Sequence, residues 1–157
     1  MIEHNPNVGI LGTHVGLSLS PVMHNAAYEA MGLPDYHYGT FTVANPRPED
    51  LQAFFETFLA EQVEAGVTGM SVTMPFKEHV LAVKGLALSK AVREIGAANT
   101  LSYKENQWHA ENTDWQGAVL SLEEAGVRIA GKKLLFLVLV AQPGVLFMVY
   151  VRAVLQG

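Results

Sequence analysis

Short apolar, β-prone runs alternate with helical patterns, and this alternation constrains the fold more than any other feature. The runs are VGILG from Val8, YHYGTFTV from Tyr36 and GMSVTM from Gly69. A helical pattern rather than a tight hairpin turn follows each of them. Strands that alternate with helices form βαβ units with a largely parallel sheet between helical layers. We therefore predict an α/β fold of three layers, with a mixed, mostly parallel sheet and helices on both faces.

Three helices and one hairpin complete this expectation. In SPVMHNAAYEAMG, Ser20 can cap a helix, Pro21 suits its first turn, and Gly32 ends it. A second helix is expected in RPEDLQAFFETFLAEQVEAG, and a later one in TDWQGAVLSLEEAG. Between them, two alternating segments flank the polar turn KEN at 104–106. They predict one antiparallel hairpin within the sheet.

Composition excludes several classes of function. A chain of 157 residues suits one domain with its own core and is too short for two ordinary domains. The formal net charge is −5, with only 10 Lys and Arg, so we expect no nucleic-acid partner. The chain has no cysteine and starts without the form of a secretion signal, which favours a cytoplasmic protein. The six histidines show no ligand spacing, and no metal is expected.

Two strings place polar side chains beside expected helix starts. In GLSLSPVMHN, Ser18 and Ser20 lie between a strand and a helix N-terminus, which suits an anionic or polyhydroxy ligand. Helix capping is the alternative for Ser20. In SVTMPFK, a strand is expected to end at Thr73, and Lys77 falls near the next helix start. Partial desolvation there would make Lys77 a usable acid or base, whereas a solvated surface lysine is the alternative.

A third string, AENTDWQG, precedes the last expected helix. Asn112 or Thr113 can cap this helix, leaving Asp114 in its first turn, where any carboxylate is favoured electrostatically. None of the three strings indicates a function alone.

In combination and in this order, GLSLSP, SVTMPFK, GAANT and ENTD resemble the substrate-binding half of the shikimate dehydrogenase family. The resemblance covers roughly Val8 to Lys133. It implies an oxidoreductase domain that binds shikimate, in the NADP-dependent reduction of 3-dehydroshikimate on the route to chorismate and aromatic amino acids. In that family a C-terminal Rossmann domain holds the NADP.

The resemblance also assigns roles to residues. Ser18 and Ser20 would hold the ligand's carboxylate, and Lys77 with Asp114 would form the catalytic pair that handles the carbinol proton. The residues implied to hold the ring hydroxyls are Thr73, Asn99 and Asp114. Two positions depart from the family pattern: Leu17 stands where His is usual, and Ser71 where Asn is usual. We expect altered ligand preference from these changes, with quinate as a possible ligand.

The tail from Leu134 departs further. In the family, a strand corresponding to GKKLLFL leads into a glycine-rich phosphate loop, but VLVAQPGV stands there. Suppose that the third codon positions in this stretch are mostly G. If the DNA is then translated in the frame that starts at the third base of the Leu137 codon, the codons of Val138 to Val145 encode a glycine-rich loop of the family's form. We therefore predict a substrate-binding domain at 1–133 and an out-of-frame apolar tail at 134–157. The Rossmann domain would be absent, NADP unbound, and the chain inactive alone.

Other interpretations of the tail remain open. About 20 apolar residues from Leu134 could span a bilayer, but Gln142, Pro143 and Arg152 interrupt them, so no membrane partner is expected. Leu134 to about Val140 could add a strand to the sheet edge, and exposed apolar residues would favour homo-oligomers. The chain could also be a non-catalytic shikimate- or quinate-binding protein or sensor.

Overall fold

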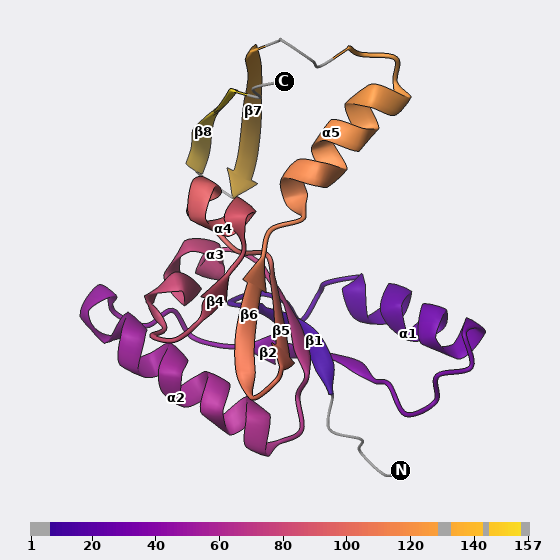
Figure 1. The fold of residues 1–157 in the computed structure, drawn as a ribbon, viewed down its shortest axis with the longest axis vertical. Coiled ribbons are helices and arrows are strands. Elements are labelled where there is room, and N and C mark those ends of the chain that lie inside the picture. Colours follow the sequence, from indigo (N-terminus) through magenta and orange to yellow (C-terminus); the bar gives the residue numbers. More distant parts are fainter. Residues whose placement is uncertain (1–6, 129–132, 143–144, 155–157) are drawn as a thin grey trace. The chain divides into compact units, whose positions relative to one another are not determined.

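The computed structural model describes residues 7–128, 133–142 and 145–154 (Figure 1). The chain forms two compact units, Met1–Thr113 and Asp114–Gly157. The first holds a six-stranded sheet with its helices, and the second holds a helix and a two-stranded hairpin.

The sheet of the first unit is mixed and mostly parallel, with strand order β2-β1-β3-β5-β6-β4. β1 pairs in parallel with β2 and β3, and β4 pairs in parallel with β6, whereas β5 is antiparallel to both β3 and β6. The predicted fold class, including the antiparallel hairpin, is confirmed. The strands are β1 Val8–Gly12, β2 Tyr38–Thr42, β3 Gly69–Val72, β4 Ala87–Leu88, β5 Thr100–Lys104 and β6 Gln107–Glu111.

Helices lie on both faces of this sheet, with α1 on one side and α2 and α3 on the other (Figure 1). The helical elements are α1 Ser20–Ala30, the 3-10 turn Pro48–Asp50, α2 Leu51–Glu64, α3 Phe76–His79, the 3-10 turn Val80–Ala82 and α4 Lys90–Ile95.

The hydrophobic core lies between the sheet and the layer of α2, α3 and α4. Alternate strand residues such as Leu11 and Leu101 point into it, as the period of two in a strand requires. Phe55 of α2 and Phe76 of α3 are fully buried, and their rings meet edge to face with centroids 5.3 Å apart. Each such side chain contributes about 1.5–3 kcal/mol through burial. This core fixes the start of α3, the helix that carries Lys77.

Polar contacts attach α1 to the opposite face of the sheet. All of α1 is described, and none of its residues is buried. The Asn25 side chain donates to the Tyr38 carbonyl oxygen (3.0 Å) and accepts from the Tyr38 N–H (2.8 Å), as a neighbouring strand would. Val22 and Met23 are instead 70% and 61% exposed. Hydrogen bonds thus help to hold α1 in place, while Val22 and Met23 face outward.

Local signals explain several boundaries. α1 begins at Ser20 with Leu19 as its N-cap residue, so the expected capping role of Ser20 is wrong; the Ser20 N–H donates to the Ser18 hydroxyl instead. The hairpin turn is Glu105–Asn106, both with positive φ (54° and 59°), the conformation that two-residue hairpin turns favour.

The sequence interpretation missed β4 and α4. The signals for α4 were present: the Ser89 hydroxyl accepts from the Val92 N–H, and Gly96 ends the helix with φ 77°. A six-residue helix shows too few turns for its periodicity to be recognised.

The second unit contains α5 Asp114–Glu124 and an antiparallel pair of β7 Lys133–Gln142 and β8 Val145–Val154. Their register runs from Lys133↔Val154 to Gln142↔Val145. The expected strand from Leu134 is therefore present, but its expected place at the edge of the main sheet is wrong, because β7 pairs with β8 in a separate sheet. None of the described helices is long and apolar enough to cross a membrane.

Candidate functional site

The sheet topology brings the predicted site residues of the first unit to one edge. Because β1 and β3 are parallel, the segments that follow them, with Ser18 and Thr73, start at the same edge. β5 is antiparallel to β3, so Asn99, immediately before β5, lies at this edge too. In open α/β sheets, ligands bind outside the carboxyl ends of the strands.

Two serine hydroxyls lie together at the N-terminus of α1. Ser18 Oγ donates to Ser20 Oγ at 3.1 Å, and the Ser20 N–H donates to Ser18 Oγ at 3.2 Å. Both residues are half-buried. The helix N-terminus carries a partial positive charge, so this pair presents hydroxyls and a favourable potential to an anion.

Thr73 and Lys77 are held by backbone hydrogen bonds. The Thr73 N–H donates to the Leu11 carbonyl (3.0 Å), which ties the end of β3 to β1. Lys77, half-buried and second in α3, accepts at its carbonyl from the Ala98 N–H at 2.7 Å. This bond places the Lys77 backbone beside the segment that carries Asn99.

Asn99 connects three segments of the edge. Its Oδ1 accepts from the Thr100 hydroxyl (2.9 Å) and the Thr113 N–H (3.0 Å), while its Nδ2 donates to the Thr113 hydroxyl (2.9 Å). Its carbonyl accepts from the Val72 N–H at 2.7 Å. The amide group is therefore held in one orientation, as a ligand contact requires.

Asp114 completes the predicted set, and Asn112, a predicted helix-cap residue, lies two positions before it. Asn112 is 5% exposed, and its Nδ2 donates to the Ala97 carbonyl at 2.9 Å, which secures the loop before β5. Asp114 is the first residue of α5 and belongs to the second unit. Its pairing with Lys77 remains a prediction.

A second polar cluster, not foreseen from the sequence, lies on the α1-facing side of the sheet. Tyr38 is 4% exposed, and its hydroxyl donates to Ser71 Oγ at 2.8 Å. The His24 ring stacks on the Tyr38 ring, with centroids 4.2 Å apart and planes at 12°. Burial raises the pKa of Tyr38, the side-chain hydrogen bond with Ser71 partly opposes this, and the nearby Tyr28 adds to the rise. The phenol therefore remains a protonated donor near neutral pH.

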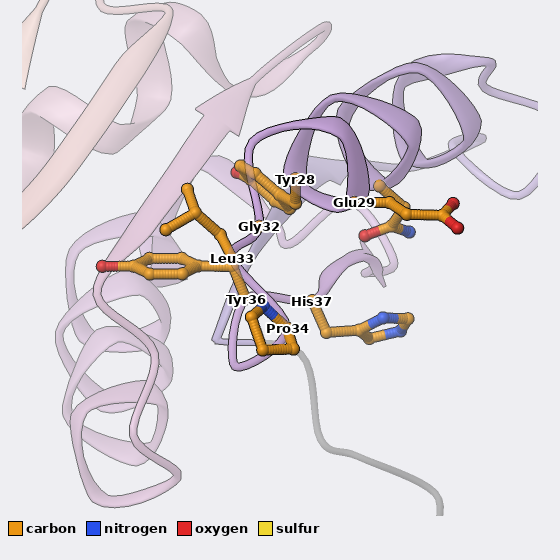
Figure 2. A pocket seen from close by; sticks show the side chains of 8 residues that line it. Tyr28, Glu29, Gly32, Leu33, Pro34, Tyr36 and His37 are labelled. Atoms are coloured by element: carbon orange, nitrogen blue, oxygen red, sulfur yellow. The ribbon is translucent and has the colours of Figure 1, made fainter.

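A recess of about 330 Å³ lies at the other end of α1 (Figure 2). The rings of Tyr28 and Tyr36 lie 5.6 Å apart beside it, and Glu29 and His37 lie on its rim. Of the described residues that line it, none is a predicted site residue. The helix separates the two ends by roughly 16 Å, so this recess is distinct from the candidate site.

The second half of β7 does not fit a dinucleotide. A pyrophosphate is held by a glycine-rich turn that opens a helix, with free N–H groups directed at the phosphates. In the described part of this segment, Val138–Gln142 instead continue β7 and pair with β8. Among the residues that the structure describes, no cluster of His, Cys, Asp and Glu could hold a metal ion.

Comparison with known proteins gives a consistent answer. A family model, the shikimate dehydrogenase substrate binding domain, matches residues 10–101. The shikimate dehydrogenase (NADP(+)) of Symbiobacterium thermophilum is 41% identical over 125 residues, covering 80% of this chain and 40% of that protein. The Synechocystis enzyme is 41% identical over 117 residues, covering 74% and 37%.

Solved structures agree. Shikimate 5-dehydrogenase from Listeria monocytogenes, in complex with shikimate and NAD, superposes with a TM-score of 0.65 at 34% identity, covering 84% of this chain and 43% of that one. The Thermus thermophilus enzyme, in complex with NADP(H) and shikimate, gives 0.61 at 30% identity, covering 78% and 43%.

This chain spans about 40% of the length of the relatives that it matches. The family model spans the chain from β1 to the start of β5, including the predicted site residues of the first unit. From the family model, the sequence identities and the fold together, the chain belongs to the shikimate dehydrogenase family and carries its substrate-binding domain.

Proposed function

We propose that this chain binds shikimate or 3-dehydroshikimate at the edge formed by the ends of β1 and β3 and the start of β5. The observation that carries the proposal is the convergence of the Ser18–Ser20 pair, Thr73, Lys77 and the Asn99 amide on one edge. Shikimate has a carboxylate and three ring hydroxyls, and these groups match a hydroxyl pair at a helix N-terminus and a set of fixed polar side chains.

The serine pair suits the carboxylate. Ser20 Oγ accepts from Ser18, and among the described residues the Ser20 hydroxyl proton has no acceptor. A carboxylate placed there would accept this proton in a charge-assisted hydrogen bond. Thr73, Asn99 and Asp114 would hold the ring hydroxyls.

In the direction of shikimate oxidation, the reverse of the reduction, loss of hydride from the carbinol carbon must be accompanied by loss of its hydroxyl proton. Lys77 would take that proton, and Asp114, bonded to the same hydroxyl, would orient it. The reaction of the whole enzyme is the NADP-dependent reduction of 3-dehydroshikimate. We propose that this chain does not bind NADP, because β7 occupies the place of the phosphate loop.

Isothermal titration with shikimate tests the proposal. We expect weak binding by the wild-type chain, and about 3- to 10-fold weaker binding when Lys77→Ala or Asn99→Ala removes one hydrogen-bonding group. Lys90→Ala is the matched control, because the Lys90 side chain is 85% exposed on α4. Equal affinities for Lys77→Ala and Lys90→Ala, or tight binding of NADP, would contradict the proposal.

We further propose that residues 134–157 are translated out of frame, and that 1–133 is the substrate-binding domain. A binding-only protein or sensor for shikimate or quinate is the second candidate, favoured by the absence of a phosphate loop in the described part of β7. The DNA around Leu137 separates the two. Cytoplasmic location and self-association through the tail remain predictions.

A further inference from the structure

We propose that Tyr38 is a positioning residue for the ligand site, and that it acts by orienting the Ser71 hydroxyl as a donor to the bound ligand. Ser71 would then help to determine which hydroxy acid the site prefers. The inference rests on the proposed function, since it assumes that the ligand binds at this edge of the sheet.

The strand register places Ser71 next to the predicted site residues. Ser71 is the Cα partner of Thr100, whose hydroxyl donates to the Asn99 amide oxygen. It precedes Thr73 by two residues on the same face, about 7 Å away. Like Thr73, Ser71 is only partly buried. A ligand that contacts Thr73 and Asn99 would therefore lie within reach of Ser71.

Tyr38 is fixed on three sides. Its backbone is bonded at both the N–H and the carbonyl to the Asn25 side chain, its ring stacks on His24, and its hydroxyl reaches Ser71 at 2.8 Å. These contacts hold the Tyr38 hydroxyl group in one place. The partner oxygen on Ser71 is held with it.

The direction of the Tyr38–Ser71 bond decides the role of Ser71. A hydroxyl has one donor and two acceptor sites. In the described part of the chain, Ser71 Oγ is the one acceptor of the Tyr38 proton, and a buried phenol that did not donate would leave its proton unsatisfied. Ser71 therefore accepts from Tyr38, and its own proton can be donated to a ligand oxygen.

An asparagine at this position, the residue usual in the family, would offer two donors and a carbonyl acceptor. Ser71 is shorter and offers one donor and one remaining lone pair. The exchange removes hydrogen-bonding capacity from one point of the site, and the Tyr38 phenol compensates by directing the single proton.

The test compares shikimate and quinate affinities of the full chain by isothermal titration for wild type, Tyr38→Phe, Ser71→Ala and the double variant. Tyr38→Phe and Ser71→Ala should each lower the affinity for the preferred ligand by roughly 3- to 10-fold. The double variant should be no weaker than Ser71→Ala alone, because Tyr38 acts through Ser71. Ser71→Asn should change the quinate-to-shikimate affinity ratio by about 3-fold or more.

Tyr36→Phe is the matched control, since Tyr36 is 47% exposed and lines the separate recess. Additive losses in the double variant would show a merely structural role for Tyr38 and overturn the inference, as would unchanged affinity in both single variants. If the wild-type chain binds neither acid, the proposed function fails and this inference fails with it. Wild-type binding without any effect of Tyr38→Phe overturns the inference alone.

Discussion

Replacing Gly12 by alanine should damage both the fold and the ligand edge. A Cβ at Gly12 would lie 2.6 Å from Thr73 Cγ2 and 2.7 Å from Val15 Cγ1, well inside ordinary contact, which begins at 3.4 Å. Both neighbours are β-branched, and Val15 is 3% exposed, so neither can rotate away freely. The added methyl group must displace Thr73, the backbone, or both.

The cost follows from overpacking. Inserting a methyl group into a filled space costs about 1–3 kcal/mol. Alanine also restricts the unfolded chain, which returns about 0.4–1 kcal/mol. The net loss, about 1.3 kcal/mol at the middle of these ranges, should lower Tm by roughly 3–5 °C. Displacement of Thr73 should in addition lower the affinity for shikimate by roughly 3- to 10-fold, because one hydrogen bond to the ligand is lost.

Thermal unfolding and titration of the same preparation provide the assay. Gly16→Ala is the matched control, because a Cβ there meets no atom within 4 Å. It should leave Tm unchanged or slightly raised. The reasoning is refuted if Gly12→Ala is as stable as Gly16→Ala and binds shikimate as tightly as the wild type.

Four further predictions concern the turn, the buried phenol, catalysis and the tail. Glu105→Asn should raise the free energy of unfolding in urea by about 0.5 kcal/mol, because asparagine tolerates the positive φ of 54° that strains glutamate; an unchanged value would count against strain at the turn. Burial raises the pKa of Tyr38 above 10.0, so its contribution to stability is complete below that pH and is lost as the pH rises through the folded-state pKa. Tyr38→Phe should therefore lose less stability than the wild type at alkaline pH, and parallel curves of unfolding free energy against pH would contradict this. The purified chain should show no NADP-dependent oxidation of shikimate above its Lys77→Ala variant, and a Lys77-dependent rate without added protein would disprove the missing cofactor site. Sequencing should find G at the third codon position of Leu137 and the five following residues, and one base added near Phe136 should open a frame of about 100–150 residues; early closure of that frame would exclude the frameshift.

Much of the fold could be predicted because its signals are local. VGILG became β1 without a change of boundary, and the polar turn between β5 and β6 was evident from KEN. α4 was missed because its signals are a cap at Ser89 and a terminator at Gly96, with few helical turns between them. β7 was expected, but its partner was not, because an apolar strand does not specify which edge it pairs with.

The residues of the candidate site could be proposed from the sequence, whereas the hydrogen bonds between them could not. Ser18 and Asn99 follow from the resemblance. The Asn99–Thr113 bonds and the bond from Tyr38 to Ser71 join residues 14 and 33 positions apart, and strand register, which a single sequence leaves open, decides whether they meet. Ser71 stands out in the sequence only as a departure from the family pattern. Tyr38 does not stand out, because a tyrosine in an apolar run suggests core packing.

The reversed direction of β5 has a consequence for the order of folding. The proposed ligand site needs β1, β3 and β5 in register, and Asn99 is held by Val72 on one side and Thr113 on the other. Contacts between residues that are far apart in the sequence form later and more slowly than local contacts. A nascent chain that has not yet emerged beyond Glu111 would have the serine pair but no fixed amide. Ligand capture would therefore report completion of the sheet, and ligand added during refolding would stabilise the finished fold without accelerating the earlier steps.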